Sequence, residues 1–152
     1  MLFKLDPIHI SSALGILFYF LTLVVLYKTG TTIYQIKAGN QYKSFYFPIA
    51  FAGFALQSHG QIFATGGLET SLFTFLILTG NVFLLLSDRG LHLLTGFFLL
   101  VLSIMTRPDG ALFYSFAVLY VVLFKYRHTD YKTYFTNQFA LQLPFIFVFL
   151  PY

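Results

Sequence analysis

Long apolar runs constrain the fold of this sequence more than any other feature. Five runs of 14 to 20 residues are separated by polar segments and a sixth begins near residue 139; the five cover residues 8–27, 45–63, 68–87, 91–105 and 111–124. A helix of about 20 residues is about 30 Å long, which matches the hydrocarbon core of a bilayer. The runs are too continuous for a membrane barrel, whose strands alternate over about 10 residues.

The low content of charged residues leads to the same class of protein. Charged side chains make up 9% of the 152 residues, whereas a soluble domain carries about 25%. So few charges cannot cover a water-facing surface. We therefore predict an all-α, polytopic transmembrane helical bundle with about five full helices and a partial sixth, forming a single region over residues 1–152.

The basic residues predict how this bundle is oriented. With six crossings, Lys4 and Arg107 fall on one side of the membrane. Seven basic residues fall on the other side: Lys28, Lys37, Lys43, Arg89, Lys125, Arg127 and Lys132. Because basic loops are retained in the cytoplasm, we expect Asp6, Glu69 and Asp109 to lie outside. The net charge of +4 is then loop charge rather than a nucleic-acid surface.

Both ends of this arrangement look incomplete. The six-crossing arrangement puts residue 1 outside the membrane with no helix before it, and the sixth run is still apolar at Tyr152. We therefore expect the chain to be a fragment of a larger membrane protein.

The first candidate site lies between the second and third runs, where Gly66 and Gly67 shortly precede Glu69. Glycines let a ligand or another backbone approach closely. A carboxylate at the mouth of a bundle can bind a cation, act as a base or pair with a basic side chain. The alternative is structural, because acids stabilise the first turn of a helix through its macrodipole. Both interpretations remain open.

Arg107 and Asp109 form the second candidate site, on either side of Pro108 between the fourth and fifth runs. A guanidinium offers a planar fork of five donors suited to phosphate or carboxylate. The structural alternatives are an ion pair of Arg107 with Glu69 or with Asp109, and a helix cap made by Asp109. Polar groups at membrane depth are often functional, so a binding role is retained beside these alternatives.

A polar patch around His59 ends the second run, with Gln57, Ser58 and Gln61 beside it. Polar groups are costly in hydrocarbon, so we expect His59 to face the bundle near the glycine segment. A lone histidine is more often hydrogen-bonded within a bundle than a ligand. Because the sequence has no cysteine and no further ligands at zinc spacing, no metal or other cofactor is evident.

Two stretches of the sequence resemble motifs of bacterial GT-C membrane glycosyltransferases. Residues 65–70 read TGGLET and residues 102–110 read LSIMTRPDG. The likeness is greatest to the arabinofuranosyltransferases that finish mycobacterial cell-wall arabinan. Those enzymes typically show GLE before a small residue and TRP before an acid and a glycine, at a similar separation. The resemblance extends over roughly residues 6–124, and Phe63 stands near the place where the family often has a tryptophan.

The resemblance implies a multi-pass enzyme of the bacterial inner membrane, surrounded by membrane lipids. Such an enzyme moves a sugar from a polyprenyl-phosphate donor to a cell-envelope glycan or lipid-linked acceptor on the outer face. It implies substrate binding by Glu69, Arg107, Asp109, His59 and Gly67, with Arg107 on the donor phosphate. The family's catalytic aspartate lies in an earlier outer loop, so we expect this chain to lack it, together with the first helix and the C-terminal domain.

The topology also predicts a contact between two of these residues. Residues 88–90 alone join the third and fourth runs, so their helices should be antiparallel neighbours. Glu69 and Arg107 each lie about 18 to 19 residues from that turn, which is about 27 to 28 Å along a helix. They should reach nearly the same height, where a charge-assisted contact is available.

Two other functions remain open on the sequence. One is a small transporter or channel subunit, with Glu69, His59 and Arg107 along a pathway, and the other is a non-catalytic membrane assembly protein. Transporter helices are often broken at the midplane, in corresponding places of two halves. Here the Gly66-Gly67 pair and Pro108 fall at membrane boundaries and no halves repeat. The comparison favours the glycosyltransferase.

Overall fold

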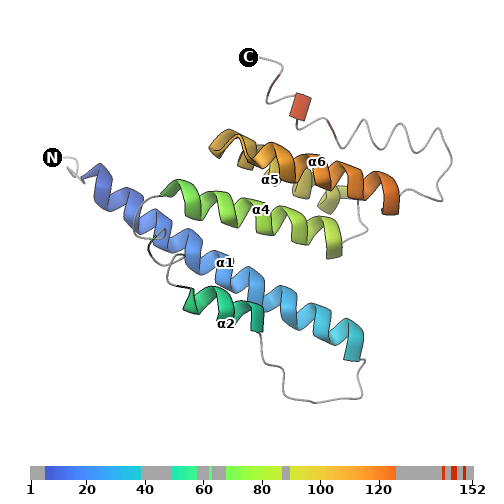
Figure 1. Ribbon diagram of the computed structural model, residues 1–152, viewed down its shortest axis with the longest axis horizontal. Helices are drawn as coiled ribbons and strands as arrows, with labels where there is room; N and C mark the ends of the chain where they lie inside the picture. The colour runs from blue at the N-terminus through green and yellow to red at the C-terminus, as the bar shows by residue number, and fades with distance from the viewer. Residues whose placement is uncertain are drawn as a thin grey trace. The chain divides into compact units, whose positions relative to one another are not determined.

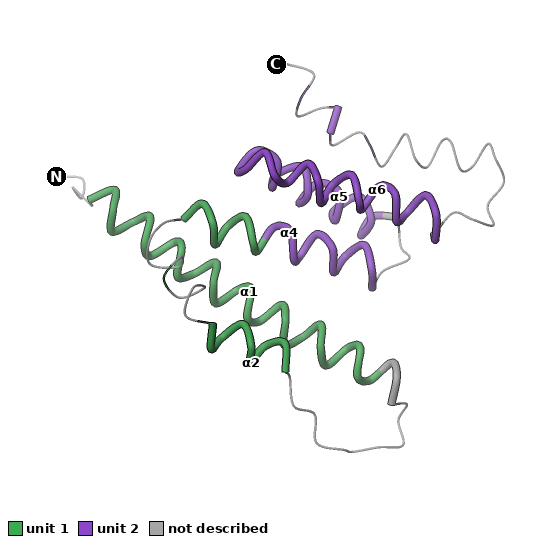
Figure 2. The backbone as a smooth tube through the Cα atoms, in the orientation of Figure 1, with its two compact units in different colours: residues 1–75 green, residues 76–152 purple. Residues whose placement is uncertain are grey.

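The computed structural model describes residues 6–38, 49–57, 62, 68–86, 90–125, 142, 145–146 and 149. Within these residues every regular element is helical, which confirms the all-α class (Figure 1). The elements are α1 (Pro7–Ala38), α2 (Ile49–Leu56), α4 (Leu68–Leu86), α5 (Gly90–Thr106), α6 (Gly110–Tyr120) and the π-helical turn η2 (Val121–Lys125). The chain divides into two units, residues 1–75 and residues 76–152, with the boundary inside α4 (Figure 2).

Helix α1 is longer than the apolar run that predicts it. The run ends at Tyr27, but the helix continues through the polar segment to Ala38. Two threonines in that segment, Thr31 and Thr32, donate their hydroxyls to the Lys28 carbonyl at 2.8 and 2.9 Å, so they satisfy their own polar groups within the helix. A fall in hydropathy does not by itself end a helix, because the signals for a helix end are capping residues and glycine.

In the first unit, α2 packs antiparallel to α1. The Tyr19 hydroxyl lies within hydrogen-bond distance of the carbonyls of Phe54 and Ala55, at 3.1 and 3.3 Å. These carbonyls belong to the last turn of α2, where no N–H of the helix reaches them. The Tyr19 ring stacks on Phe54, and Tyr27 contacts Phe51 edge-on. The contact of the later residue in α1, Tyr27, is with the earlier residue in α2, Phe51, so the two helices run in opposite directions.

The beginning of α4 packs parallel to α1 in the same unit (Figure 2). The Leu68 N–H donates to Ser11 Oγ at 3.2 Å. Two turns farther along both helices, the Phe18 and Phe75 rings contact each other with centroids 5.5 Å apart. Each contact joins residues that are 57 positions apart. The two helices therefore run in the same direction and begin at the same end, which agrees with the predicted six-crossing arrangement.

In the second unit, α4 and α5 approach each other at two glycines. A Cβ on Gly80 would lie 3.1 Å from the Gly96 carbonyl oxygen, and a Cβ on Gly96 would lie 3.0 Å from that of Gly80. Small residues at such positions let helix backbones come close in a membrane. The Phe83 and His92 rings also meet, at 5.8 Å. The order of these contacts confirms the predicted antiparallel pairing of the third and fourth helices.

The core of the second unit is apolar and lies between α5, α6 and the end of α4. Its buried members are Leu84, Leu93, Phe97, Leu100, Val101, Tyr114, Ala117 and Val121. Tyr114 contacts Phe97 edge-on, stacks on Phe145 at 5.3 Å and donates its hydroxyl to the Gln142 side-chain oxygen. Gln142 and Phe145 are helical where described, and they belong to the sixth apolar run. The described residues Gln142 and Phe145 therefore contact this core.

Two of the described helices are long and apolar enough to cross a membrane by length and composition, α1 over Pro7–Gln35 and α4 over Leu68–Leu86. Only 17% and 22% of the residues in their most apolar windows are buried, so both helices expose apolar surface. This supports membrane association. The fourth and fifth runs form shorter apolar helices, α5 and α6 with η2. Of the second run, predicted over residues 45–63, the described part is α2, Gln57 and Ile62.

Candidate functional site

The turn between α5 and α6 is built largely by the backbone. The Arg107 N–H donates to the Ser103 carbonyl at 2.9 Å, and the Gly110 N–H donates to the Arg107 carbonyl at 2.9 Å. The next two N–H groups, of Ala111 and Leu112, donate to the carbonyls of Pro108 and Asp109. A proline fits here because the turn uses its carbonyl and requires no N–H from it. The turn fixes the positions of Arg107 and Asp109 relative to each other.

Ser103 and Gly110 close this turn on its inner side. Ser103 is fully buried, and its hydroxyl donates to the Leu100 carbonyl at 2.7 Å. A Cβ on Gly110 would lie 2.8 Å from Ser103 Oγ, from the Ser103 carbonyl carbon and from the Ile104 nitrogen. Glycine is the one residue type without a Cβ, so it alone permits this approach. The motif therefore has a steric reason for a glycine after the acid.

Arg107 and Asp109 form an ion pair across Pro108. The Arg107 Nη2 atom lies 3.4 Å from Asp109 Oδ2, and the side chains are 37% and 66% exposed. Asp109 also occupies the N-cap position of α6, but it makes no side-chain capping hydrogen bond. Its backbone is already helical, with φ −58° and ψ −22°, whereas a capping residue needs an extended backbone. Of the structural alternatives for Asp109, the ion pair is present and the cap is not.

Glu69 is the second residue of α4 and its side chain is exposed. The position is in the first turn, where the helix macrodipole favours a negative charge. The neighbouring Leu68 N–H is held by Ser11 of α1. Sequence reasoning missed Ser11, because a hydrogen bond between residues so far apart in the chain leaves no local pattern. The fold places Glu69 at the end where both α1 and α4 begin.

The structure brings together one pair of the predicted site residues, Arg107 and Asp109. His59 and Gly67 lie outside the described residues. Glu69 belongs to the first unit and Arg107 to the second, so the contact between these two stays a prediction. Within the part of the chain that the structure describes, no three His, Asp or Glu side chains are grouped to hold a metal ion.

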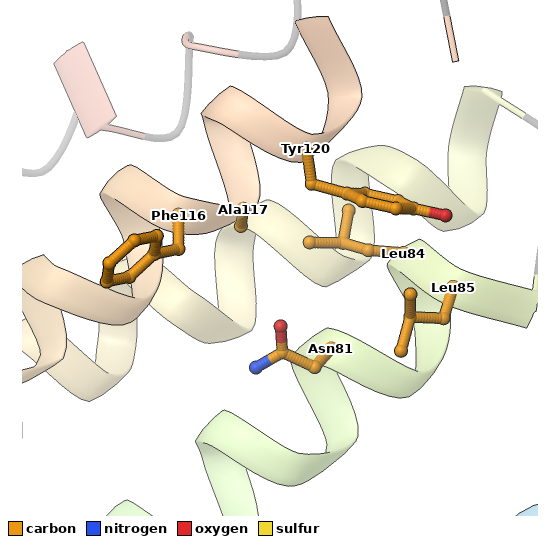
Figure 3. Close-up of a pocket in the computed structure, with 6 residues that line it drawn as sticks. All are labelled: Asn81, Leu84, Leu85, Phe116, Ala117 and Tyr120. Carbon is orange, nitrogen blue, oxygen red and sulfur yellow. The ribbon is translucent and has the colours of Figure 1, made fainter. Parts of the chain in front are cut away.

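An apolar pocket of about 210 Å³ lies in the second unit, and none of the predicted site residues lines it (Figure 3). Its lining comes from α4 and α6: Asn81, Leu84, Leu85, Phe116, Ala117 and Tyr120. The Asn81 side-chain nitrogen donates a hydrogen bond to the Ile77 carbonyl at 2.9 Å. The Asn81 side-chain oxygen is drawn toward α6 in Figure 3. Asn81 is an amide inside an apolar run, a signal that sequence reasoning had available and did not use.

Comparisons with known proteins give no match for this chain among family models, curated proteins or solved structures.

Proposed function

We propose that the chain is the transmembrane core of a glycosyltransferase of the bacterial inner membrane. The enzyme moves a sugar from a polyprenyl-phosphate donor to a cell-envelope glycan or lipid-linked acceptor on the outer face. The observation that carries the proposal is the turn at Arg107 and Asp109. It lies at the end of an apolar helix, holds an exposed guanidinium in place and accounts sterically for the glycine of the motif.

The Arg107–Asp109 pair suits a phosphate that arrives with a lipid. The nitrogen–oxygen distance of 3.4 Å is long and both side chains are exposed, so the pair contributes only about 0–1 kcal/mol. A phosphate makes stronger, bidentate contacts with a guanidinium than this geometry allows the carboxylate. The donor phosphate can therefore replace Asp109 as the partner of Arg107 at little cost. Asp109 keeps the guanidinium oriented until the donor binds.

Glu69 takes the second role, in which its carboxylate orients the donor or accepts a hydrogen bond from an acceptor hydroxyl. Its support is the packing of α4 on α1, which puts this carboxylate at an end shared by two apolar helices. The role does not require Glu69 to touch Arg107. It requires both residues to face the same side of the membrane, which the six-crossing arrangement with its seven basic cytoplasmic residues provides.

The orientation is tested by labelling engineered cysteines, because the sequence has none of its own. Asp109→Cys and Thr32→Cys place one thiol at each side, and both positions are exposed. In intact cells a membrane-impermeant maleimide should label Asp109→Cys, and it should label Thr32→Cys only after the membrane is permeabilised. The reverse pattern would contradict the proposed orientation.

The function is tested by transfer from a radiolabelled polyprenyl-phosphate sugar in membranes that contain the full-length enzyme. Glu69→Gln should reduce transfer about 10- to 100-fold, since a hydrogen bond to a charged group is worth about 1.5–3 kcal/mol. Asp6→Asn is the matched control. It removes a carboxylate that caps α1 through the Ile8 N–H at 3.2 Å, and asparagine caps helices equally well. Equal transfer by the Glu69→Gln and Asp6→Asn enzymes would remove Glu69 from the site.

A further inference from the structure

The hydrogen bond between Ser11 of α1 and α4 differs from the hydrogen bonds that the threonines of α1 make. Thr22, Thr31 and Thr32 donate their hydroxyls to carbonyls of α1 itself. The Ser11 hydroxyl oxygen instead accepts the Leu68 N–H, at 3.2 Å and in a partly buried setting. Leu68 is the first residue of α4, and the first N–H groups of a helix have no acceptor within that helix. A side chain of one helix thus satisfies the free end of another.

This contact fixes more than one atom of α4. The Phe18 and Phe75 rings meet two turns along the same pair of helices, so α4 is held on α1 at its first residue and again at its eighth. Glu69 follows Leu68 directly, and neighbouring Cα atoms are about 3.8 Å apart. A shift of the Leu68 backbone therefore moves the Glu69 carboxylate by a similar amount. The Phe75 contact limits sliding of α4 along α1, whereas the Ser11 hydrogen bond holds the residue next to Glu69.

We infer that Ser11 is a positioning residue for Glu69. Its hydroxyl holds the first turn of α4 against α1 and so sets where the Glu69 carboxylate lies. The effect on the carboxylate follows from the contact itself, and the effect on sugar transfer rests on the proposed function. Loss of the hydroxyl releases the Leu68 N–H and lets the first turn fray, while the later turns stay packed through the Phe18–Phe75 contact.

Glu69 is the only glutamate in the sequence, so glutamate labelled with ¹³C reports on this one carboxylate. The chain in lipid nanodiscs should give a Glu69 carboxyl resonance that moves in Ser11→Ala and stays in place in Ser11→Thr, which keeps a hydroxyl. The Leu68 amide should exchange its hydrogen about fivefold faster in Ser11→Ala, as expected for loss of one hydrogen bond. Ser115→Ala is the matched control, since that hydroxyl donates only to Ala111 of its own helix.

The outcomes separate the inference from the proposed function. Unchanged Leu68 exchange and an unchanged Glu69 resonance in Ser11→Ala would overturn the inference, and so would an equal change in Ser11→Thr, which would point to packing rather than the hydroxyl. If the Ser11→Ala resonance moves while transfer by the enzyme stays normal, Ser11 positions Glu69 but Glu69 does not serve the reaction. If neither the variants nor the wild-type full-length enzyme transfer sugar, the proposed function fails, and the Glu69 resonance and the Leu68 exchange rate still decide the inference.

Discussion

Replacement of Gly110 by alanine should lower the free energy of unfolding by about 3 kcal/mol, at the upper end of the range for overpacked sites. The new Cβ would lie 2.8 Å from two backbone atoms of α5, the Ser103 carbonyl carbon and the Ile104 nitrogen. Backbone atoms cannot turn aside as a flexible side chain can. The turn must open, which separates α5 from the start of α6 and exposes the fully buried Ser103.

Gly53→Ala is the control for this substitution. Gly53 lies in the middle of α2, where a Cβ would meet nothing within 4 Å. Alanine is favoured over glycine within a helix by up to about 1 kcal/mol, so Gly53→Ala should leave stability unchanged or raise it. Unfolding of both variants in detergent, followed by circular dichroism, measures the difference. Equal stability of the two variants would show that the α5–α6 turn does not require a glycine.

Replacement of Arg107 by glutamine should weaken binding of polyprenyl phosphate about 10- to 100-fold. The estimate comes from the loss of one charge-assisted contact worth about 1.5–3 kcal/mol, since each 1.4 kcal/mol is a factor of ten in affinity. The turn should keep its backbone hydrogen bonds, because those from Arg107 to Ser103 and from Gly110 to Arg107 use the Arg107 main chain. Titration of the chain in nanodiscs with polyprenyl phosphate gives the dissociation constant.

Two further variants sharpen the test of Arg107. Arg107→Lys keeps the charge but loses the planar fork, so its affinity should fall between those of the wild type and Arg107→Gln. Lys28→Gln removes an exposed basic residue on the side predicted to be cytoplasmic, and it should bind like the wild type. If Lys28→Gln weakens binding as much as Arg107→Gln, the interaction is general attraction between a basic chain and an anionic lipid.

Local patterns predicted the parts of the fold that depend on neighbouring residues. The antiparallel pairing of α4 with α5 followed from a connection of three residues, because so short a link leaves few other arrangements. The end of α1 was not predicted, since hydropathy falls after Tyr27 while the helix continues to Ala38. Helix ends follow capping and backbone signals, which lie farther along the chain.

The candidate site was likewise predicted only in part. The sequence placed Arg107 and Asp109 together and left their relationship open, because a cap and an ion pair use the same residues at the same spacing. The backbone angles at Asp109 decide between them. The sequence could not identify Ser11 as a contact residue. Its partner Leu68 is 57 positions away, and no local pattern distinguishes Ser11 from another hydroxyl residue on the same face of α1.

The most direct test of the proposed function compares three lipids with the wild-type chain in nanodiscs. Polyprenyl phosphate, the corresponding polyprenol without phosphate, and phosphatidic acid differ in the phosphate and in the lipid chain. We predict that polyprenyl phosphate binds at least about tenfold more tightly than either of the others, because one charge-assisted contact is worth that factor. We also predict that this preference is lost in Arg107→Gln. Equal binding of all three lipids, or a preference that survives in Arg107→Gln, would contradict the proposal that this chain belongs to a polyprenyl-phosphate-dependent glycosyltransferase.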